Sequence, residues 1–154
     1  MGMDSQDDAA ANVEVRVFSM DDYDRVLALW RQCEGVGLSQ ADSRQAIQAY
    51  LQRNPGMSLV ACAADTVVGA ILCGHDGRRG YIYHLAVSPQ YRRRGIGRLL
   101  VQRCLDSLKG AGIDKCHIFI FNTNQAGIAF WKAVGWTPRS DIGVISKDLD
   151  PAVR

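Results

Sequence analysis

One stretch, Tyr81 to Lys109, constrains the fold of this chain more than any other part of the sequence. It opens on an apolar, β-rich run, Tyr81 to Val87, that predicts a strand. Ser88-Pro89 ends that strand, because proline has no N–H to give to a sheet. Arginines and glycines come next, and then a helix is predicted whose apolar residues share one face: Leu99, Leu100, Cys104, Leu105 and Leu108. The stretch therefore predicts a strand, a glycine-containing loop and a helix, in that order.

The loop between this strand and this helix has the features of an anion-binding site. The first N–H groups of a helix have no partner inside it, and the aligned peptide dipoles add positive charge there. Gly95 and Gly97 lack a Cβ, so a phosphate can approach the backbone closely. Four arginines add permanent charge around the same point: Arg92, Arg93, Arg94 and Arg98. Together these features predict a cradle for a diphosphate group.

Two common diphosphate motifs are excluded. The Walker pattern fails because no Lys-Ser or Lys-Thr pair follows the glycines, and the dinucleotide fingerprint fails because Leu100 stands where its third glycine belongs. The pattern Arg-x-x-Gly-x-Gly, from Arg92 to Gly97, remains. Taken alone it leaves an alternative open, since an arginine run is often a solvated surface and glycines near a helix start often serve only as turn residues.

That pattern, behind a strand ending in Leu85-Ala86-Val87, resembles motif A of the GNAT superfamily of N-acetyltransferases, which bind acetyl-coenzyme A. Asn124 and Phe130-Trp131, later in the chain, fit the same family. The resemblance covers about residues 13 to 149 and is most specific from Tyr81 to Trp136. It implies an α/β (α+β) fold, the GNAT fold, in which a mixed, mostly antiparallel, splayed sheet of six to seven strands is flanked by about four helices.

The order of elements along the chain agrees with that fold. Apolar patterning and turn residues predict strands at 13–18, 57–64, 67–73 and 115–121, besides the strand and helix already described, with final strand material at Trp136 and at 142–149. Helices are predicted from Asp21-Asp22 to about Gly35, from Asp42 or Ser43 to Asn54, and from a cap at 122–124 to Gly135. We expect one domain over 13–149, a disordered tail at 1–12 and a C-terminal tail at 150–154.

The resemblance also implies roles for individual residues. Main-chain groups of Leu85, Ala86 and Val87 are expected to contact the pantetheine arm and the thioester of acetyl-CoA. Backbone N–H groups of the loop are expected to hold the pyrophosphate, with Arg98 at its edge; the loop residues are Arg92, Arg93, Arg94, Gly95, Ile96 and Gly97. Asn124 is expected near the pantetheine arm, and Phe130 as an apolar wall.

The implied reaction is the transfer of an acetyl group from acetyl-CoA to a primary amine by direct attack in a ternary complex. The amine could belong to a small molecule, a peptide N-terminus or a lysine, and the use of longer acyl-CoAs stays open. In this family the acceptor lies near residues that here are Cys33 to Arg44 and Thr137 to Gly143. Carboxylates there that could hold an ammonium group are Glu34, Asp42 and Asp141, and we assign none of them.

Two catalytic side chains of the family are missing here. Trp131 stands where the family has a tyrosine that protonates the thiolate, and an indole N–H cannot serve as a general acid. Phe119 and its neighbours stand where some members carry a glutamate base. The nearest substitutes are on the central strand, at Tyr81, Tyr83 and His84, and we take His84 and Tyr83 as the candidates. Strict alternation predicts that these two side chains lie on opposite faces, so only one can face the thioester; a purely structural role for His84 is the alternative.

Composition excludes several other classes. A net charge of +2 is too small to indicate a protein that binds nucleic acid or a membrane through its overall charge. Three separated histidines and five scattered cysteines give no metal-ligand spacing, and the cysteines are expected to be reduced in a cytoplasmic protein. We therefore expect acetyl-CoA as cosubstrate, no metal, and an amine as partner, with a homodimer left open. A non-catalytic acyl-CoA-binding or regulatory module is the alternative that Trp131 raises.

Overall fold

A computed structural model of the chain describes residues 12–150. The predicted tails at 1–12 and 150–154 lie outside this range, apart from Asn12 and Asp150. The chain divides into two compact units, one ending at Phe119 and the other beginning at Ile120. The single domain expected over 13–149 stays a prediction.

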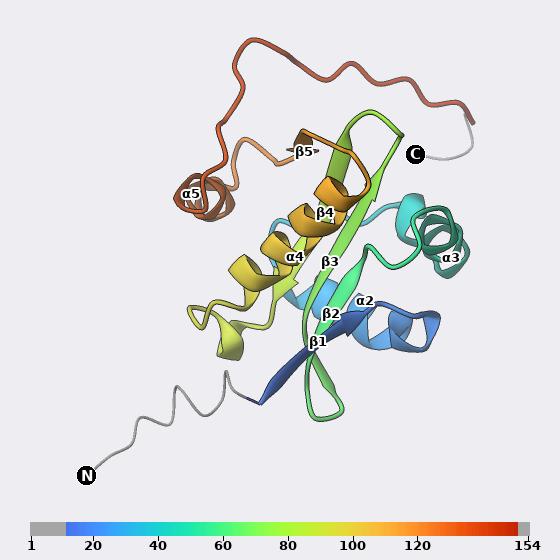
Figure 1. Cartoon of the computed structure of the whole chain (residues 1–154), viewed down its shortest axis with the longest axis vertical. Coiled ribbons are helices and arrows are strands. Elements are labelled where there is room, and N and C mark those ends of the chain that lie inside the picture. Colours follow the sequence, from blue (N-terminus) through green and yellow to red (C-terminus); the bar gives the residue numbers. More distant parts are fainter. Residues whose placement is uncertain (1–11, 151–154) are drawn as a thin grey trace. The chain divides into compact units, whose positions relative to one another are not determined.

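The first unit is built on a sheet of five strands, in the order β1-β2-β3-β4-β5 (Figure 1). The strands are β1 (Val13–Val17), β2 (Leu59–Ala63), β3 (Thr66–His75), β4 (Gly80–Val87) and β5 (Cys116–Ile118). Neighbours are antiparallel as far as β4, and β4 pairs with β5 in parallel. The mixed, mostly antiparallel sheet is thus confirmed, with five strands in the described residues rather than six or seven.

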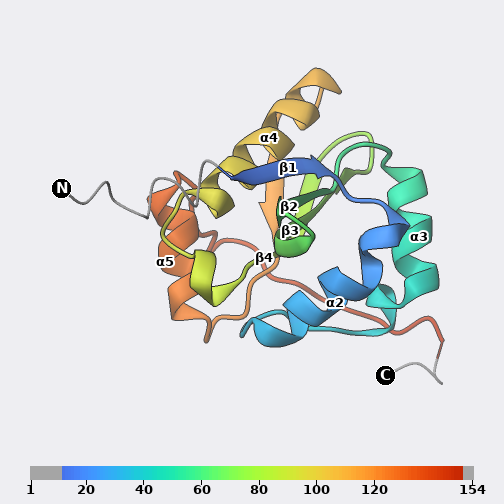
Figure 2. The same ribbon diagram turned by 90° about the horizontal axis from the view of Figure 1, so that it is seen from below.

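Helices cover both faces of this sheet. Figure 2 shows α4 (Ile96–Gly110) on one face, with α2 (Tyr23–Gln32) and α3 (Arg44–Arg53) on the other. Because both faces are covered, β2 and β3 read as almost continuous apolar runs rather than as alternating ones, and nearly every residue in them is buried. The core on the α2–α3 side joins Trp30 and Ile47 of the helices to Val60, Leu72 and Ala86 of the sheet.

On the other face, α4 packs against β2, β3 and β4. Its buried side chains follow helical spacing: Ile96, Leu100, Val101, Cys104 and Leu108. The sequence placed Leu99 on this face, but Leu99 is 42% exposed. The buried stripe begins at Ile96, the first residue of α4, and repeats every four residues, and this register turns Leu99 outward.

The second unit contains α5 (Gln125–Ala133), the helix expected after Asn124. In the first unit, the strand expected at 115–121 is present but shorter, as β5 at Cys116–Ile118. In the second unit, the strand expected at 142–149 is wrong, because the described residues 137–149 form no strand. An apolar segment is stable as a strand only when it pairs with a neighbouring strand. Within residues 12–150, no strand pairs with the segment 142–149.

Candidate active site

The strand β4 has one edge that is only partly paired. Along one side it pairs with β3 from Gly80 to Val87. Along the other side β5 pairs only with Gly80, Tyr81 and Ile82. In the part of the chain that the structure describes, Tyr83 to Val87 therefore have no strand partner on that edge. An open sheet edge offers backbone groups to an extended ligand, as it would to an added strand.

A bulge interrupts β4 where this open edge begins. Tyr83 pairs with Leu72 and Ala86 pairs with Ala70, so His84 and Leu85 together oppose a single residue of β3. His84 has a φ of +52°, in the left-handed region that side chains other than glycine rarely adopt. The backbone therefore departs from strand geometry at this residue.

The bulge changes which side chains share a face. The ring of Tyr83 lies 6.3 Å from that of Tyr50 on α3, and the ring of His84 lies 5.1 Å from that of Trp30 on α2. Both side chains are thus on the α2–α3 side of the sheet. The prediction of opposite faces was wrong, because it assumed an uninterrupted alternation along the strand.

His84 makes three contacts, two with Trp30 and one with Asp42. The indole N–H of Trp30 donates to the His84 carbonyl at 3.2 Å, and the Trp30 ring meets the imidazole edge to face. Nε2 of His84 lies 2.8 Å from Oδ1 of Asp42, a buried carboxyl group. The contact joins residues 42 positions apart in the chain, so no local pattern in the sequence could have indicated it.

Tyr83 lies in a row of aromatic rings. Its ring stacks with those of Tyr81 and Phe119, at centroid distances of 6.4 Å and 6.1 Å. Burial raises the pKa of Tyr83 above its ordinary value, so the phenol keeps its proton at neutral pH. The same shift makes this phenol release its proton less readily than an exposed tyrosine would.

The residues after the bulge end the strand and lead into the loop. Ala86 is buried in the core, whereas Leu85 and Val87 are half-buried. Nε of Arg92 donates to the Val87 carbonyl at 3.1 Å, and Nη2 of the same arginine lies 3.8 Å from Sγ of Cys33. Arg92 therefore folds back on the strand end and fixes the entry to the loop.

The loop itself contains two left-handed residues, Arg93 at φ +63° and Gly95 at φ +80°. Gly95 is the N-cap of α4 and offers no side chain to the helix end. The first N–H to bond within the helix is that of Leu99, which donates to the Gly95 carbonyl at 3.0 Å. The N–H groups of Ile96, Gly97 and Arg98 come before it. Such a helix start gathers N–H groups suited to an anion.

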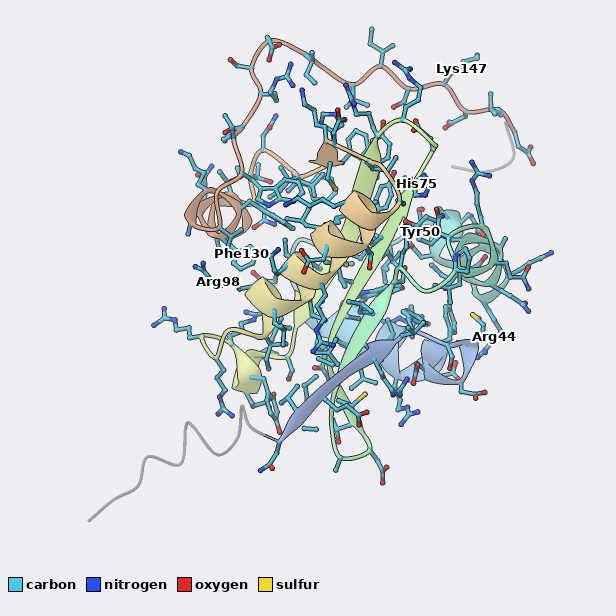
Figure 3. All side chains as sticks on the ribbon, viewed as in Figure 1. Arg44, Tyr50, His75, Arg98, Phe130 and Lys147 are labelled. Carbon is cyan, nitrogen blue, oxygen red and sulfur yellow. The ribbon has the colours of Figure 1, made fainter. Side chains whose placement is uncertain are left out.

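The arginines of the loop are arranged unequally. The guanidinium of Arg94 lies over the Tyr91 ring at 5.0 Å. Arg93 and Arg98 are exposed, and Figure 3 shows Arg98 at the N-terminal end of α4. Among the arginines of the loop, Arg93 and Arg98 are thus exposed. In the described residues, neither makes a hydrogen bond back to the strand end as Arg92 does.

Of the three carboxylates considered for the acceptor, two are already engaged. Asp42 contacts His84, and Asp141 pairs with Arg139, whose guanidinium makes two bonds of 2.8 Å to it and lowers the pKa of Asp141 to about 2. Glu34 is exposed.

In the second unit, Asn124 caps α5 as expected. Its Oδ1 accepts from the N–H of Gly127 at 2.9 Å. Phe130 contacts the ring of Trp131 edge to face at 5.3 Å, and Trp131 contacts Trp136 at 4.7 Å. The roles of Asn124 and Phe130 toward acetyl-CoA stay predictions.

The other histidines occupy different surroundings. Nδ1 of His75, at the end of β3, accepts from the N–H of Gly77 at 3.0 Å, and the ring of His117 lies against Tyr81. Within residues 12–150, no group of three or more His, Cys, Asp or Glu side chains is placed to hold a metal ion. None of the helices in this range is both long and apolar enough to cross a membrane.

Comparison with known proteins gives a consistent result. The model of the acetyltransferase (GNAT) family matches residues 23–136. An acetyltransferase of Sodalis glossinidius is 34% identical over 137 residues, covering 89% of this chain and 96% of that protein. An acetyltransferase of Yersinia pestis is 32% identical over 130 residues, covering 84% of this chain and 92% of that protein.

Solved structures share the fold at lower identity. The Ard1 protein of Thermoplasma volcanium superposes with a TM-score of 0.72 at 21% identity, over 82% of this chain and 83% of that one. The PaiA N-acetyltransferase of Thermoplasma acidophilum, solved in complex with coenzyme A, superposes with a TM-score of 0.74 at 19% identity, over 85% of this chain and 93% of that one.

Proposed function

The chain belongs to the acetyltransferase (GNAT) family, and from this premise we propose that it transfers the acetyl group of acetyl-CoA to the nitrogen of a primary amine by direct attack in a ternary complex. The observation that carries the proposal is the open edge of β4, from Tyr83 to Val87, which runs into the uncapped start of α4. An extended arm and a diphosphate need these two features side by side.

The loop fits a diphosphate on steric grounds as well. A Cβ placed on Gly95 would meet no atom within 4 Å. The protein's own packing therefore does not require glycine there, whereas a positive φ and close approach by a ligand both do. Backbone N–H groups from Arg92 to Gly97, with Arg98 beside them, would hold the pyrophosphate. The main chain of Leu85, Ala86 and Val87 would hold the pantetheine arm, Asn124 would support that arm, and Phe130 would form an apolar wall.

The chemistry sets three requirements for the site. A proton must leave the ammonium group, a donor must stabilise the negative charge that develops on the carbonyl oxygen, and the departing thiolate must gain a proton. A main-chain N–H near Leu85 to Val87 would serve as the donor. His84 and Tyr83 are the side chains at the bulge that can exchange protons, and Trp131 cannot replace them.

The relatives support this proposal without identifying the amine. The PaiA structure contains coenzyme A, and its fold resemblance extends over most of the present chain. The five cysteines, all free, support a reducing compartment such as the cytoplasm.

Thiol release tests the function directly. The protein is mixed with acetyl-CoA and three kinds of amine, namely a polyamine, peptides with free N-termini and an N-terminally blocked lysine peptide, and the free thiol is titrated. We expect release with at least one class. Calorimetry with Gly97→Asp, which brings a carboxylate to the start of α4, should show a large loss of acetyl-CoA affinity with the fold retained. Tight binding of acetyl-CoA without thiol release on any amine would overturn the proposal and favour a non-catalytic acyl-CoA-binding module.

A further inference from the structure

The contact between Asp42 and His84 brings a buried carboxyl group to the bulge of β4. Asp42 is 6% exposed and ends the short 3₁₀ turn Gln40–Asp42 that precedes α3. A buried carboxylate is costly unless it is hydrogen-bonded. The N–H of Ser39 donates to Oδ2 at 3.0 Å, and Nε2 of His84 lies at 2.8 Å from Oδ1. These two contacts are what the described residues give the carboxyl oxygens of Asp42.

The position of Asp42 is fixed from outside the pair as well. The hydroxyl of Tyr23, on α2, donates to the Asp42 carbonyl at 2.7 Å in a buried hydrogen bond. The nearest arginine in the sequence, Arg44, pairs instead with Asp24 at 2.5 Å. Asp42 is thus held by its backbone and its oxygens are directed to Ser39 and His84.

The left-handed backbone of His84 also indicates a functional role for this residue. A residue other than glycine at φ +52° is uncommon, although histidine enters this region more often than most residues, and such a conformation persists where its surroundings enforce it. Trp30 holds the His84 carbonyl and Asp42 holds its ring. The imidazole is 17% exposed, and no hydrogen bond to its Nδ1 exists within residues 12–150. The backbone of His84 is thus fixed at its carbonyl and its ring is fixed through Nε2, which leaves Nδ1 as the ring nitrogen that can contact a substrate.

We propose that Asp42 is a positioning residue that keeps the hydrogen of neutral His84 on Nε2, and that Nδ1 of His84 is the base that takes a proton from the acceptor ammonium. This inference rests on the acetyl transfer proposed above and names its proton acceptor. A carboxylate can only accept hydrogen bonds, so its contact with Nε2 requires the hydrogen to be there. The other nitrogen then has a free lone pair, by the same logic as an aspartate that sets the histidine tautomer in a catalytic triad.

The proton balance is complete. His84 takes one proton from the ammonium group onto Nδ1, which leaves a neutral amine. The amine nitrogen forms its bond to the acetyl carbon, and the bond from carbon to sulfur breaks with its electron pair on sulfur. The second proton of the nitrogen ends on that sulfur as thiol, and the imidazolium of His84 returns its proton to the solvent.

The placement also suits the acceptor. Asp42 belongs to the segment, Cys33 to Arg44, where the acceptor is expected, and His84 adjoins Leu85 to Val87, where the thioester is expected. The pair thus joins the two substrate segments across 42 residues of sequence. Asp42, considered above as a direct ligand for the ammonium group, instead acts through the imidazole.

Substitutions that respect the backbone test the proposal. Asparagine tolerates the left-handed region, so His84→Asn keeps the bulge and removes the base. With the amine that gives thiol release in the wild-type protein, kcat should fall by about 10²-fold in His84→Asn and by about tenfold or more in Asp42→Asn, while acetyl-CoA affinity by calorimetry stays at the wild-type value. The matched control is His117→Asn, a histidine on the next strand, which should keep kcat.

Two further measurements separate catalysis from structure. His84→Gly also suits the backbone and leaves space for a ring, so free imidazole in the buffer should restore part of its kcat, as it would not for a purely structural histidine. Nitrogen-15 spectra of the wild-type imidazoles should show His84 protonated on Nε2 and unprotonated on Nδ1, and Asp42→Asn should disturb this state.

The outcomes distinguish the two proposals. If the wild-type protein transfers acetyl to an amine but His84→Asn and Asp42→Asn keep its kcat, the assignment of this pair is wrong and the acetyltransferase stands. A hydrogen on Nδ1 in the wild-type spectra would likewise overturn the pair alone. If the wild-type protein releases no thiol with any amine, both proposals fall.

Discussion

Trp30 and His84 are joined by a hydrogen bond from the indole N–H to the backbone carbonyl, 3.2 Å long. Trp30 is almost fully buried in α2, and its ring also meets the imidazole. Helix α2, which borders the expected acceptor region, therefore fixes the bulge of β4. In the proposed function β4 is the strand that contacts the thioester. The position of the candidate base depends on a core residue that would touch neither substrate.

Trp30→Phe tests this dependence. The substitution keeps an aromatic ring in the core but leaves the His84 carbonyl without its donor, which should cost about 1–3 kcal/mol in the free energy of unfolding measured by urea denaturation. We expect kcat to fall as well, because the bulge loses one of its holding contacts, while acetyl-CoA affinity changes little. Trp136→Phe, in the second unit, is the control. A Trp30→Phe protein with wild-type stability and kcat would show that the hydrogen bond does not maintain the bulge.

An ion pair near the start of α2 should make stability depend on acid pH. The Arg16 guanidinium makes two bonds to Asp22, of 2.6 Å and 2.7 Å, and the hydrogen bond from Arg16 lowers the pKa of this almost fully buried carboxyl group below its ordinary value. A carboxyl group whose pKa is lowered by folding stabilises the fold above its unfolded pKa, about 3.9. That contribution is lost as the pH falls through the lower, folded value.

Asp22→Asn should therefore be less stable than wild type by a constant amount above about pH 5, and the difference should shrink below about pH 4. Urea denaturation at a series of pH values measures it. Asp24→Asn is the matched control: Asp24 pairs with Arg44 on the surface, where an ion pair contributes at most about 1 kcal/mol. A stability difference for Asp22→Asn that stays the same down to pH 2 would contradict the assignment.

The sequence predicted the order of elements well, because local patterns determine it. The run from Tyr81 to Val87, the stop at Ser88-Pro89 and the glycine start of α4 are all local features, and each is found within a residue or two of its expected place. The cap at Asn124 was recognised for the same reason. The strand at 142–149 was wrong because strands depend on a pairing partner, which a local pattern does not contain.

The site was only partly predictable, for a related reason. The loop from Arg92 to Gly97 could be identified because its glycines and charges are contiguous. The bulge at His84 could not, since its position depends on how β4 aligns with β3. Asp42 was one of several carboxylates in the sequence, and only the packing of the turn before α3 against β4 brings it to His84.

The cysteines should be largely unreactive in the folded protein, a point that matters for any assay that titrates thiols. Cys73 and Cys104 are completely buried. The hydrogen bond to Cys73 and burial raise the pKa of Cys104, and burial raises the pKa of Cys116 to about 12. A thiol reacts with a disulfide reagent only as the thiolate, which attacks a sulfur of the reagent, so no more than two of the five thiols should react promptly at pH 8, and all five should react in denaturant. Prompt titration of three or more thiols in the native protein would contradict this packing.

Two glycines at opposite ends of α4 offer a matched test of the diphosphate cradle. Gly95, before the helix, has φ +80°, and Gly112, after it, has φ +82°; a Cβ on either would meet no atom within 4 Å. Gly95→Ala and Gly112→Ala should thus cost the same conformational free energy, on the order of 1–2 kcal/mol in denaturation.

The two variants should differ in acetyl-CoA binding, because only the Cβ at Gly95 stands beside the first N–H groups of α4. Loss of one hydrogen bond to a charged phosphate would weaken acetyl-CoA binding by about tenfold or more in calorimetry, and Gly112→Ala should bind as wild type does. Equal affinities in the two variants would mean that the diphosphate lies elsewhere.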